Sequence, residues 1–227
     1  MSVSELSDSA QNYLKVIWAL QEWSDAPVTP SAIAERIGLS LSTVSGGLGK
    51  LSDQGLVDHQ RYGAVELTEQ GRRHAVAMVR RHRLIETFLV QVLDYRWDQV
   101  HDEAERLEHA VSDLLIDRLD THLGHPRRDP HGDPIPGRDG RVSVPDAMVL
   151  TTLADHDGTE VTVERVSDDD PNLLVHLAEQ GILVGTRLEV RSAPPYSDAV
   201  EVRVVGATGT VALGRVATDA VWVSVTD

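Results

Sequence analysis

Two histidines and two glutamates follow one another at short intervals near the middle of the chain: His101, Glu105, Glu108 and His109. On a helix with 3.6 residues per turn these positions fall within about one third of the circumference. Two imidazoles and two carboxylates on one face are ligands suited to manganese or iron. The alternative interpretation is a solvated acidic helix face, on which glutamate and histidine are common.

A second pair of the same kind precedes this cluster. His82 and Glu86 are one helical turn apart, a spacing that lets both side chains reach one ion. The alternative is a surface His–Glu pair that contributes a few tenths of a kcal/mol. Because antiparallel packing of two adjacent helices would bring both pairs together, the two pairs jointly favour a metal site.

The composition limits what that metal site can be. The 227 residues include no cysteine, which excludes disulfides, thiolate zinc sites and cysteine nucleophiles. Any metal must therefore be held by oxygen and imidazole nitrogen. The sequence shows no signal peptide and no apolar run of about 20 residues, so we expect a soluble cytoplasmic protein without a membrane partner.

The net charge of −15 argues against nucleic-acid binding, unless the charge is distributed unevenly. It is uneven. Five arginines lie between Arg72 and Arg83 with no acid among them, whereas acids are concentrated between His101 and Asp120.

The elements that must position these residues begin with three short helices. Helical spacing of apolar residues over 7–23 predicts the first helix, and SAIAERIGL and STVSGGLGKLSDQ predict two more, separated by Gly38. LVDHQRYGAVELTEQG alternates like a hairpin. Together these segments predict a winged helix-turn-helix, which serves DNA binding or, as the alternative, protein contacts or plain packing.

We expect DNA contacts from hydroxyl and basic side chains of the helix-turn-helix and the wing: Thr29, Ser40, Ser42, Thr43, Ser45, Lys50 and Arg61. Gly46 and Gly47 lie in the middle of the third helix, where each costs up to about 1 kcal/mol relative to alanine. They indicate either close approach of the backbone to DNA or discrimination by methyl contacts and groove shape.

The remaining sequence predicts helices over 72–92 and 97–123, then a segment rich in proline and glycine over 124–146 that is a linker or an ordered loop. Short alternating runs over 147–227, with one helical insert, predict a small β-barrel. The predicted fold class is mainly α with a β C-terminal domain. The predicted domains are 1–73 for DNA binding, 74–141 for helical dimerisation and metal binding, and 147–227 for the barrel.

The chain resembles the diphtheria toxin repressor/manganese transport regulator family of metal-dependent repressors. The resemblance covers most of residues 7–141 and is carried by AQNYLKVIW, the helix-turn-helix, the wing, RRHRLIETFL, HDEAERLEHAVSD and DPHGDPIPG. Residues 147–227 resemble more loosely the family's barrel, which is of the Src-homology-3 type. The resemblance implies a homodimer that binds double-stranded DNA and carries two metal sites per subunit.

The resemblance also implies the ligands. The primary site would use Asn12, Glu105, Glu108 and His109, and the ancillary site would use His82, Glu86, His101 and Asp170 from the barrel. Glu105 stands where iron-responsive members have cysteine, and this hard carboxylate favours Mn²⁺ over Fe²⁺. Asn12 stands where manganese regulators have aspartate, so this ligand would lack a charge.

The sequence thus predicts a Mn²⁺-activated repressor, without an organic cofactor, that controls metal-homeostasis genes through a palindromic operator. One alternative is an Fe²⁺-responsive repressor of the same family. A di-metal hydrolase is the alternative from another class, but no nucleophile or general-base motif is present, so we expect no enzyme. A metal buffer would leave the helix-turn-helix unexplained, and a regulator that senses an organic ligand would leave both His/Glu pairs unexplained.

Overall fold

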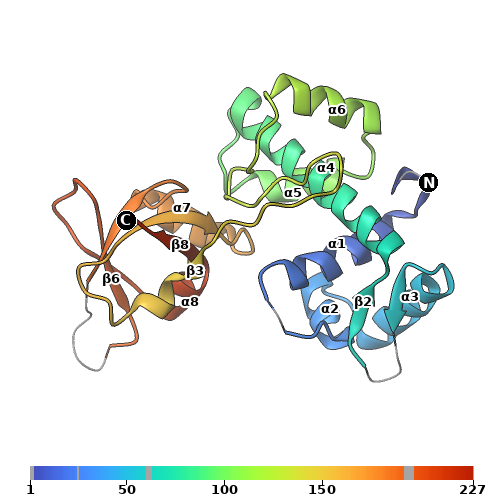
Figure 1. The fold of residues 1–227 in the computed structure, drawn as a ribbon, viewed down its shortest axis with the longest axis horizontal. Coiled ribbons are helices and arrows are strands. Elements are labelled where there is room, and N and C mark those ends of the chain that lie inside the picture. Colours follow the sequence, from blue (N-terminus) through green and yellow to red (C-terminus); the bar gives the residue numbers. More distant parts are fainter. Residues whose placement is uncertain (1–2, 25, 60–62, 192–196, 227) are drawn as a thin grey trace. The chain divides into compact units, whose positions relative to one another are not determined.

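The computed structural model describes residues 3–24, 26–59, 63–191 and 197–226, so Arg61 lies outside the described residues (Figure 1). The chain forms two compact units, each built from separate stretches of sequence. The first comprises Met1–Ile85, Ala104–His125 and Ile135–Val142; the second comprises Glu86–Glu103, Pro126–Pro134 and Ser143–Asp227. By packing, the segment predicted as a domain over 74–141 is therefore shared between the two units. None of the helices in the described ranges has the length and apolarity that crossing a membrane requires.

The first unit contains the predicted winged helix-turn-helix. Its elements are η1 (Val3–Glu5), α1 (Asp8–Glu22), α2 (Pro30–Ile37), α3 (Leu41–Asp53), β1 (Val57–His59) and β2 (Val65–Leu67). Strands β1 and β2 pair antiparallel as the wing, with Val57 opposite Leu67. Leu14, Ile33 and Leu48, one from each helix, are fully buried in a shared core. Removal of this apolar surface from water fixes the three helices against one another.

The helices after the wing differ in part from the prediction. Helix α4 (Glu69–Leu93) runs without a break. The prediction of a single helix over 97–123 is wrong: the chain forms two helices there, α5 (Val100–Leu107) and α6 (Asp113–His122). Ser112 adopts an extended backbone and its hydroxyl accepts a hydrogen bond from the Leu115 amide at 3.2 Å, which caps the start of α6. Glu108 and His109 consequently lie in the turn after α5.

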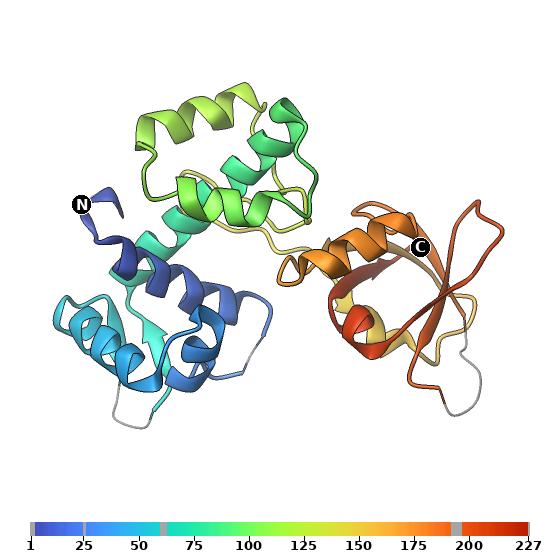
Figure 2. The ribbon, with the colours of Figure 1, turned by 180° about the vertical axis from the view of Figure 1, so that it is seen from behind.

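The second unit contains an antiparallel six-stranded sheet with the order β3-β8-β4-β5-β6-β7. The elements of this part of the chain are β3 (Met148–Val149), η2 (Leu150–Leu153), β4 (Glu160–Val166), α7 (Pro171–Glu179), β5 (Arg187–Arg191), β6 (Val200–Val204), β7 (Val211–Leu213), α8 (Arg215–Asp219) and β8 (Val221–Val225). Alternate residues of the strands, such as Val161 and Val163, are fully buried with Leu174 and Leu177 of α7. Figure 2 shows helix α7 lying across the strands of this unit. The predicted fold class, helical with a small β C-terminal domain, is confirmed.

Residues 126–134 of the segment predicted as a linker or an ordered loop are fixed to strand β4. The Val166 amide donates to the His131 carbonyl at 2.9 Å, and Arg165 Nε donates to Asp133 Oδ1 at 2.6 Å. Gly132 has φ +92°, and a Cβ there would lie 2.1 Å from the Glu164 carbonyl oxygen. Only glycine fits such a close approach of two backbones, so this stretch is an ordered loop. We call residues 126–134 the docked loop.

Candidate metal centres

The first candidate centre lies in the first unit, where α1, α4, the end of α5 and the turn after α5 meet. One ligand atom from each of His82, Glu105 and Glu108 lies within 4.8 Å of the others. His82 Nδ1 is 2.6 Å from Glu108 Oε2, and the Glu108 side chain is fully buried. Burial by itself raises the pKa of Glu108, but the hydrogen bond and charge of His82 and the charge of Lys15 outweigh it, so the net pKa is lowered. We call His82, Glu105 and Glu108 the first cluster.

Lys15 of α1 supplies the positive charge of this centre. Its Nζ lies 2.5 Å from Glu105 Oε1 and 2.6 Å from Glu108 Oε1. The Lys15 side chain is 11% exposed, so the ammonium sits between the two carboxylates largely away from water. The point between these oxygens is therefore a favourable position for a cation.

His109 lies beside the first cluster, and Asn12 of α1 is the remaining predicted ligand. His109 Nδ1 lies 2.8 Å from Gln11 Oε1, and His109 Nε2 lies 3.7 Å from Glu108 Oε1. Asn12 Oδ1 is buried and has no hydrogen-bond partner in the described part of the chain. A buried oxygen without a partner costs free energy unless something else binds it. The donor set and this orphaned oxygen both fit a divalent cation, and Asn12, Glu105, Glu108 and His109 are the predicted primary ligands.

The uneven charge distribution left room for a basic DNA-binding surface on α4, but three of the arginines there are buried in ion pairs. Arg80, Arg81 and Arg83 of α4 are buried and pair with Asp120, Asp113 and Glu22, respectively. Arg83 thereby joins α4 to α1, and Arg81 joins α4 to the start of α6 and, through Ser4, to η1. These three guanidinium groups stabilise the first unit instead of forming a basic surface for DNA.

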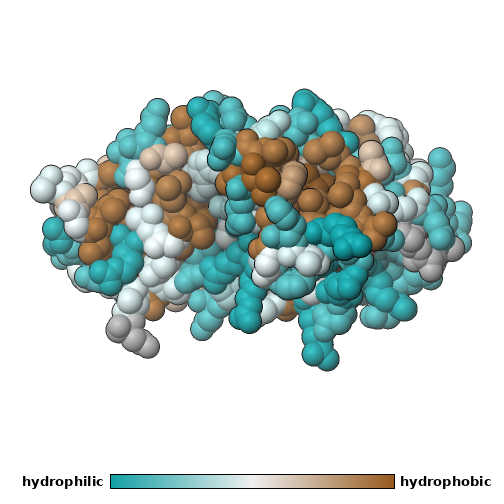
Figure 3. All heavy atoms as spheres, turned by 90° about the horizontal axis from the view of Figure 1, so that it is seen from above, coloured by the Kyte–Doolittle hydropathy of each residue, from teal (hydrophilic) through white to brown (hydrophobic). Residues whose placement is uncertain are grey.

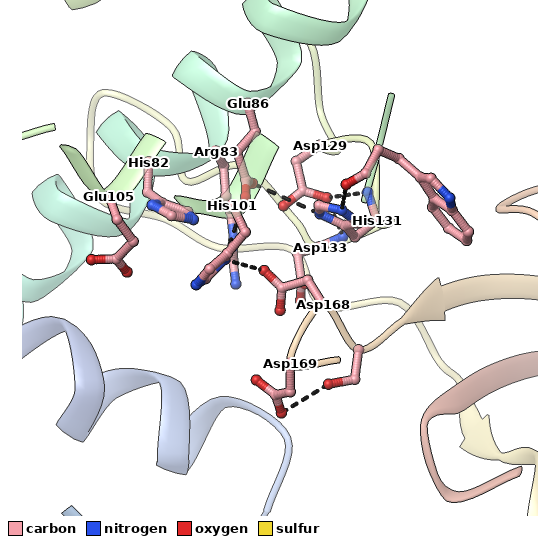
Figure 4. A network of polar contacts seen from close by, with 12 residues as sticks. His82, Arg83, Glu86, His101, Glu105, Asp129, His131, Asp133, Asp168 and Asp169 are labelled. Atoms are coloured by element: carbon pink, nitrogen blue, oxygen red, sulfur yellow. Dashed lines mark hydrogen bonds and ion pairs between the residues drawn. The ribbon is translucent and has the colours of Figure 1, made fainter. Parts of the chain in front are cut away.

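The second candidate centre lies in the second unit and is fully drawn in Figure 4. One ligand atom from each of Glu86, His101 and Asp168 lies within 4.8 Å of the others, and the same holds for Glu86, Asp129 and His131. Glu86 thus faces both groups. His101 Nδ1 is 2.7 Å from Asp168 Oδ2 and 3.7 Å from Glu86 Oε1. We call these five residues the second cluster.

The ring of His131 is held in one orientation by two contacts with Trp97. Its Nε2 lies 2.8 Å from the Trp97 carbonyl oxygen, and its ring stacks on the Trp97 ring at 5.9 Å between centroids. Because a carbonyl only accepts, Nε2 carries the proton and donates, which turns Nδ1 toward Glu86 Oε2 at 3.9 Å. This Nδ1 is buried without a hydrogen-bond partner among the described residues. An imidazole nitrogen directed in this way fits a metal ligand.

The acidic surroundings change the protonation of both histidines. Burial lowers the pKa of His101, but its contacts with Asp168 and Glu86 outweigh burial and raise the pKa to about 11. Burial likewise lowers the pKa of His131, and the charges of Glu86, Asp129 and Asp168 raise it by more. Three carboxylates around two imidazoles make this cluster attractive to a cation.

Asp170, the predicted barrel ligand, is not brought to this cluster. It is the N-cap of α7, where its Oδ1 accepts from the Asn172 amide at 2.9 Å. Asp168, two residues earlier, faces His101 instead. Sequence reasoning also missed Asp129 and His131, although the DPHGDPIPG motif contains both. A histidine flanked by acids in a proline- and glycine-rich loop was the available signal.

The single-face arrangement predicted for His101, Glu105, Glu108 and His109 is not what forms. Helix α5 ends at Leu107, and His101 contacts Glu86 and Asp168 while Glu105 and Glu108 contact Lys15. The division of these four residues between two metal sites, which the resemblance implied, stays a prediction.

Most predicted DNA contacts lie on the exposed side of the helix-turn-helix. Thr29 and Ser40 are the N-caps of α2 and α3, and Ser42, Thr43, Ser45 and Lys50 are exposed on α3. Gly46 has open space around it, whereas a Cβ on Gly47 would lie 2.6 Å from the Tyr13 ring. Gly47 is therefore explained by packing against α1, and Gly46 leaves a flat exposed surface.

Comparison with known families gives three matches that together cover most of the chain. Residues 5–65 match the family model "Iron dependent repressor, N-terminal DNA binding domain", and residues 68–137 match "Iron dependent repressor, metal binding and dimerisation domain". Residues 150–225 match the FeoA domain.

Among curated proteins, the iron-dependent repressor IdeR of Mycobacterium leprae is 34% identical over 202 residues, which is 85% of this chain and 87% of that protein. The diphtheria toxin repressor of Corynebacterium glutamicum is 38% identical over 197 residues, or 83% and 86% of the two chains. A solved manganese-dependent transcriptional repressor in complex with manganese is 54% identical, covers 96% of this chain and 100% of its own, and has a TM-score of 0.90. The solved manganese regulator SloR is 29% identical with a TM-score of 0.79, and the match covers 97% and 100% of the two chains. The chain belongs to the diphtheria toxin repressor/manganese transport regulator family of metal-dependent transcriptional repressors.

Proposed function

We propose that this chain is a Mn²⁺-activated repressor that binds a palindromic operator in the cytoplasm and controls metal-homeostasis genes. The observation that carries the choice of metal is the donor set of the first cluster. It contains two carboxylates and imidazole nitrogen, in a chain without cysteine. Hard oxygen ligands suit Mn²⁺, whereas soft thiolates favour other metals. The 54% identical structure is that of a manganese-dependent repressor, which supports the same choice.

We propose two metal sites per subunit. Glu105, Glu108, His109 and Asn12 would hold the first ion together with His82, which the resemblance had assigned to the ancillary site but which contacts Glu108. Glu86, His101, Asp129, His131 and Asp168 would hold the second ion. A bound Mn²⁺ supplies a divalent charge that carboxylates from different elements share. Through Asn12, the first site would then include α1, whose core residues pack against α2 and α3. The chain's own part is to present these ligands with their lone pairs directed into each cluster.

A homodimer is the assembly that a palindromic operator requires, because two-fold symmetry of the DNA matches two-fold symmetry of the protein. Helix α6 exposes Leu114 at 66% and Leu115 at 44%. Figure 3, which looks down on the face where α6 lies in Figure 1, shows apolar surface there. The match of residues 68–137 to a metal binding and dimerisation domain supports this role.

The test is metal-dependent binding of DNA. A duplex would be selected by the wild-type chain with Mn²⁺ from a randomised pool, and binding would be followed by fluorescence anisotropy with Mn²⁺, Fe²⁺, Co²⁺ and Zn²⁺ at matched free concentrations. We expect Mn²⁺ to activate at micromolar concentrations, and Glu108→Gln to weaken metal-dependent binding by about a hundredfold. Glu179→Gln, at an exposed position of α7, is the matched control. DNA binding of equal strength without metal would contradict the mechanism, and activation by Fe²⁺ alone would replace manganese by iron.

A further inference from the structure

The chain contains only two lysines, Lys15 and Lys50, and its other basic side chains of this kind are arginines. Lys50 is exposed on α3. Its Nζ contacts Glu105 and Glu108, the two carboxylates that the proposed function assigns to the first metal ion. An ammonium is a compact point charge on a flexible stem, whereas a guanidinium is a broad rigid fork. A lysine head therefore fits between two carboxylate oxygens and can also leave that position by rotation of its stem.

Two cations cannot share this place. A divalent ion bound by Glu105 and Glu108 would lie a few ångströms from an ammonium that kept its contacts, and like charges repel strongly at such distances in a poorly solvated site. Glu108 is fully buried and the Lys15 side chain is 11% exposed, so water screens the repulsion little at Glu108 and more at Glu105, which is 36% exposed. Binding of the metal must then be accompanied by release of the ammonium.

We propose that Lys15 is a tethered cation that competes with the metal ion for the first cluster and so sets the metal concentration at which the repressor is activated. In the metal-free chain the ammonium balances the charge of two close carboxylates and links α1 to the α5–α6 segment. The metal takes over both tasks when it displaces the ammonium. This inference rests on the proposed function, since it assigns a competitor to the proposed metal site.

The sign of one substitution separates this proposal from its alternative. If Lys15 competes, Lys15→Met removes the competitor, and Mn²⁺ should bind the first cluster about tenfold more tightly or better. If Lys15 instead organises Glu105 and Glu108 for the metal, the same substitution should weaken binding. Lys15→Arg retains the competing charge on a more rigid group, so it should bind Mn²⁺ more weakly than Lys15→Met. Lys50→Met is the control for loss of a lysine elsewhere.

The experiment is calorimetric titration of Mn²⁺ into each variant in an Asp168→Asn background, which weakens the second cluster. Thermal denaturation of the metal-free proteins provides a second readout: Lys15→Met should unfold at a lower temperature than wild type without metal, and the deficit should shrink when Mn²⁺ is added. Unchanged or weaker Mn²⁺ binding by Lys15→Met would overturn the proposal. Absence of Mn²⁺ binding by the wild-type first cluster would overturn the proposed function itself.

A measurement on the wild-type chain keeps the proposal testable if Lys15→Met does not fold. With ¹⁵N-labelled lysine, two ammonium signals are expected, and the buried Lys15 group should exchange its protons with water more slowly than Lys50. Addition of diamagnetic Zn²⁺ should move the Lys15 signal toward that of an exposed lysine. A Lys15 signal that stays unchanged at saturation would show that the ammonium is not displaced, and would overturn the proposal.

Discussion

The ring orientation of His109 is set by a single amide, that of Gln11. Gln11 Nε2 donates to the carbonyls of Val3 and Leu6 at 3.2 and 2.9 Å, so its oxygen must be the atom that faces His109. An amide oxygen only accepts, which places the imidazole proton on Nδ1. His109 Nε2 is then left with a lone pair, the state that a metal ligand needs.

Replacement of Gln11 by methionine should therefore weaken metal binding without removing any ligand. We expect Gln11→Met to lower the Mn²⁺ affinity of the first cluster by about tenfold to a hundredfold, the range typical of residues that orient a ligating histidine. Calorimetric titration measures the change, and Gln21→Met, at an exposed position of the same helix, is the control. Equal affinities of the two variants would show that Gln11 does not orient the ring.

The carboxylate of Asp120 gives the first unit a dependence on pH. Burial raises the pKa of Asp120, but its bonds with His125 and with Arg80 at 2.9 Å outweigh burial and lower it. A carboxyl with a lowered pKa in the folded state stabilises the fold above its unfolded value of about 3.9, and this contribution disappears as the pH falls through the folded value.

Asp120→Asn should accordingly reduce the free energy of unfolding by about 3 kcal/mol at pH 7, because it leaves the buried Arg80 without its ion pair. The difference from wild type should become smaller below pH 4. Urea denaturation of both proteins at pH 7 and pH 3 measures it. A difference that does not change with pH would assign the effect to packing instead of charge.

At the scale of the elements, the glycines of helix α3 have two different structural roles. Gly47 faces α1, where its missing side chain makes room for the Tyr13 ring. Gly46 and Gly49 face open space, next to the exposed Ser42 and Ser45. The sequence identified the cost of mid-helix glycines, but it could not assign Gly47 to packing because that requires knowing which face meets α1.

Alanine substitutions at Gly47 and at Gly46 should change the stability in opposite directions. Gly47→Ala should destabilise the protein by about 1–3 kcal/mol, since an inserted methyl group would force the Tyr13 ring to move. Gly46→Ala should stabilise it by up to about 1 kcal/mol through helix propensity, and should weaken DNA binding if the backbone approaches the groove there. Thermal denaturation and fluorescence anisotropy measure the two effects. Destabilisation by Gly46→Ala would contradict the open space around this residue.

The break between α5 and α6 marks a limit of periodicity as evidence. The apolar and acidic pattern continues across residues 108–112, so spacing alone predicts one helix. The Ser112 cap is visible in the sequence, but serine is also tolerated inside helices, and the competition is settled by tertiary contacts such as those of Glu108 with His82 and Lys15.

At the scale of the whole molecule, the second cluster collects residues that lie far apart in sequence. The sequence predicted Glu86 as a ligand from its spacing to His82, and His101 from the acidic motif that follows it. Both residues lie on helices, whose faces can be read from the sequence. Asp129, His131 and Asp168 lie in loops, where no periodicity predicts direction. In the run of three aspartates 168–170, only the loop geometry decides that Asp168 faces His101 and Asp170 caps α7.

Substitutions of Asp168 and of Asp170 should therefore differ in their effect on stabilisation by Mn²⁺. Mn²⁺ that binds only the folded second cluster raises the stability by about 2.7 kcal/mol at a concentration 100 times its Kd. Asp168→Ala should abolish most of this gain. Asp170→Ala should lower the stability by about 1 kcal/mol through loss of the cap, but keep the gain. Calorimetric scans with and without Mn²⁺ measure both, and loss of the gain in Asp170→Ala would restore Asp170 as a ligand.

The attachment of the docked loop to strand β4 has a consequence for how such a chain can change over generations. Asp129 and His131 precede the barrel in sequence, but Gly132, Asp133 and the His131 carbonyl are held by Glu164–Val166 of the barrel. A frameshift or stop codon that deletes the barrel would thus remove the support of ligands that it leaves in the reading frame. In a lineage that has lost the barrel, the codons for Asp129 and His131 remain but no longer encode supported ligands, so we expect them to accumulate substitutions.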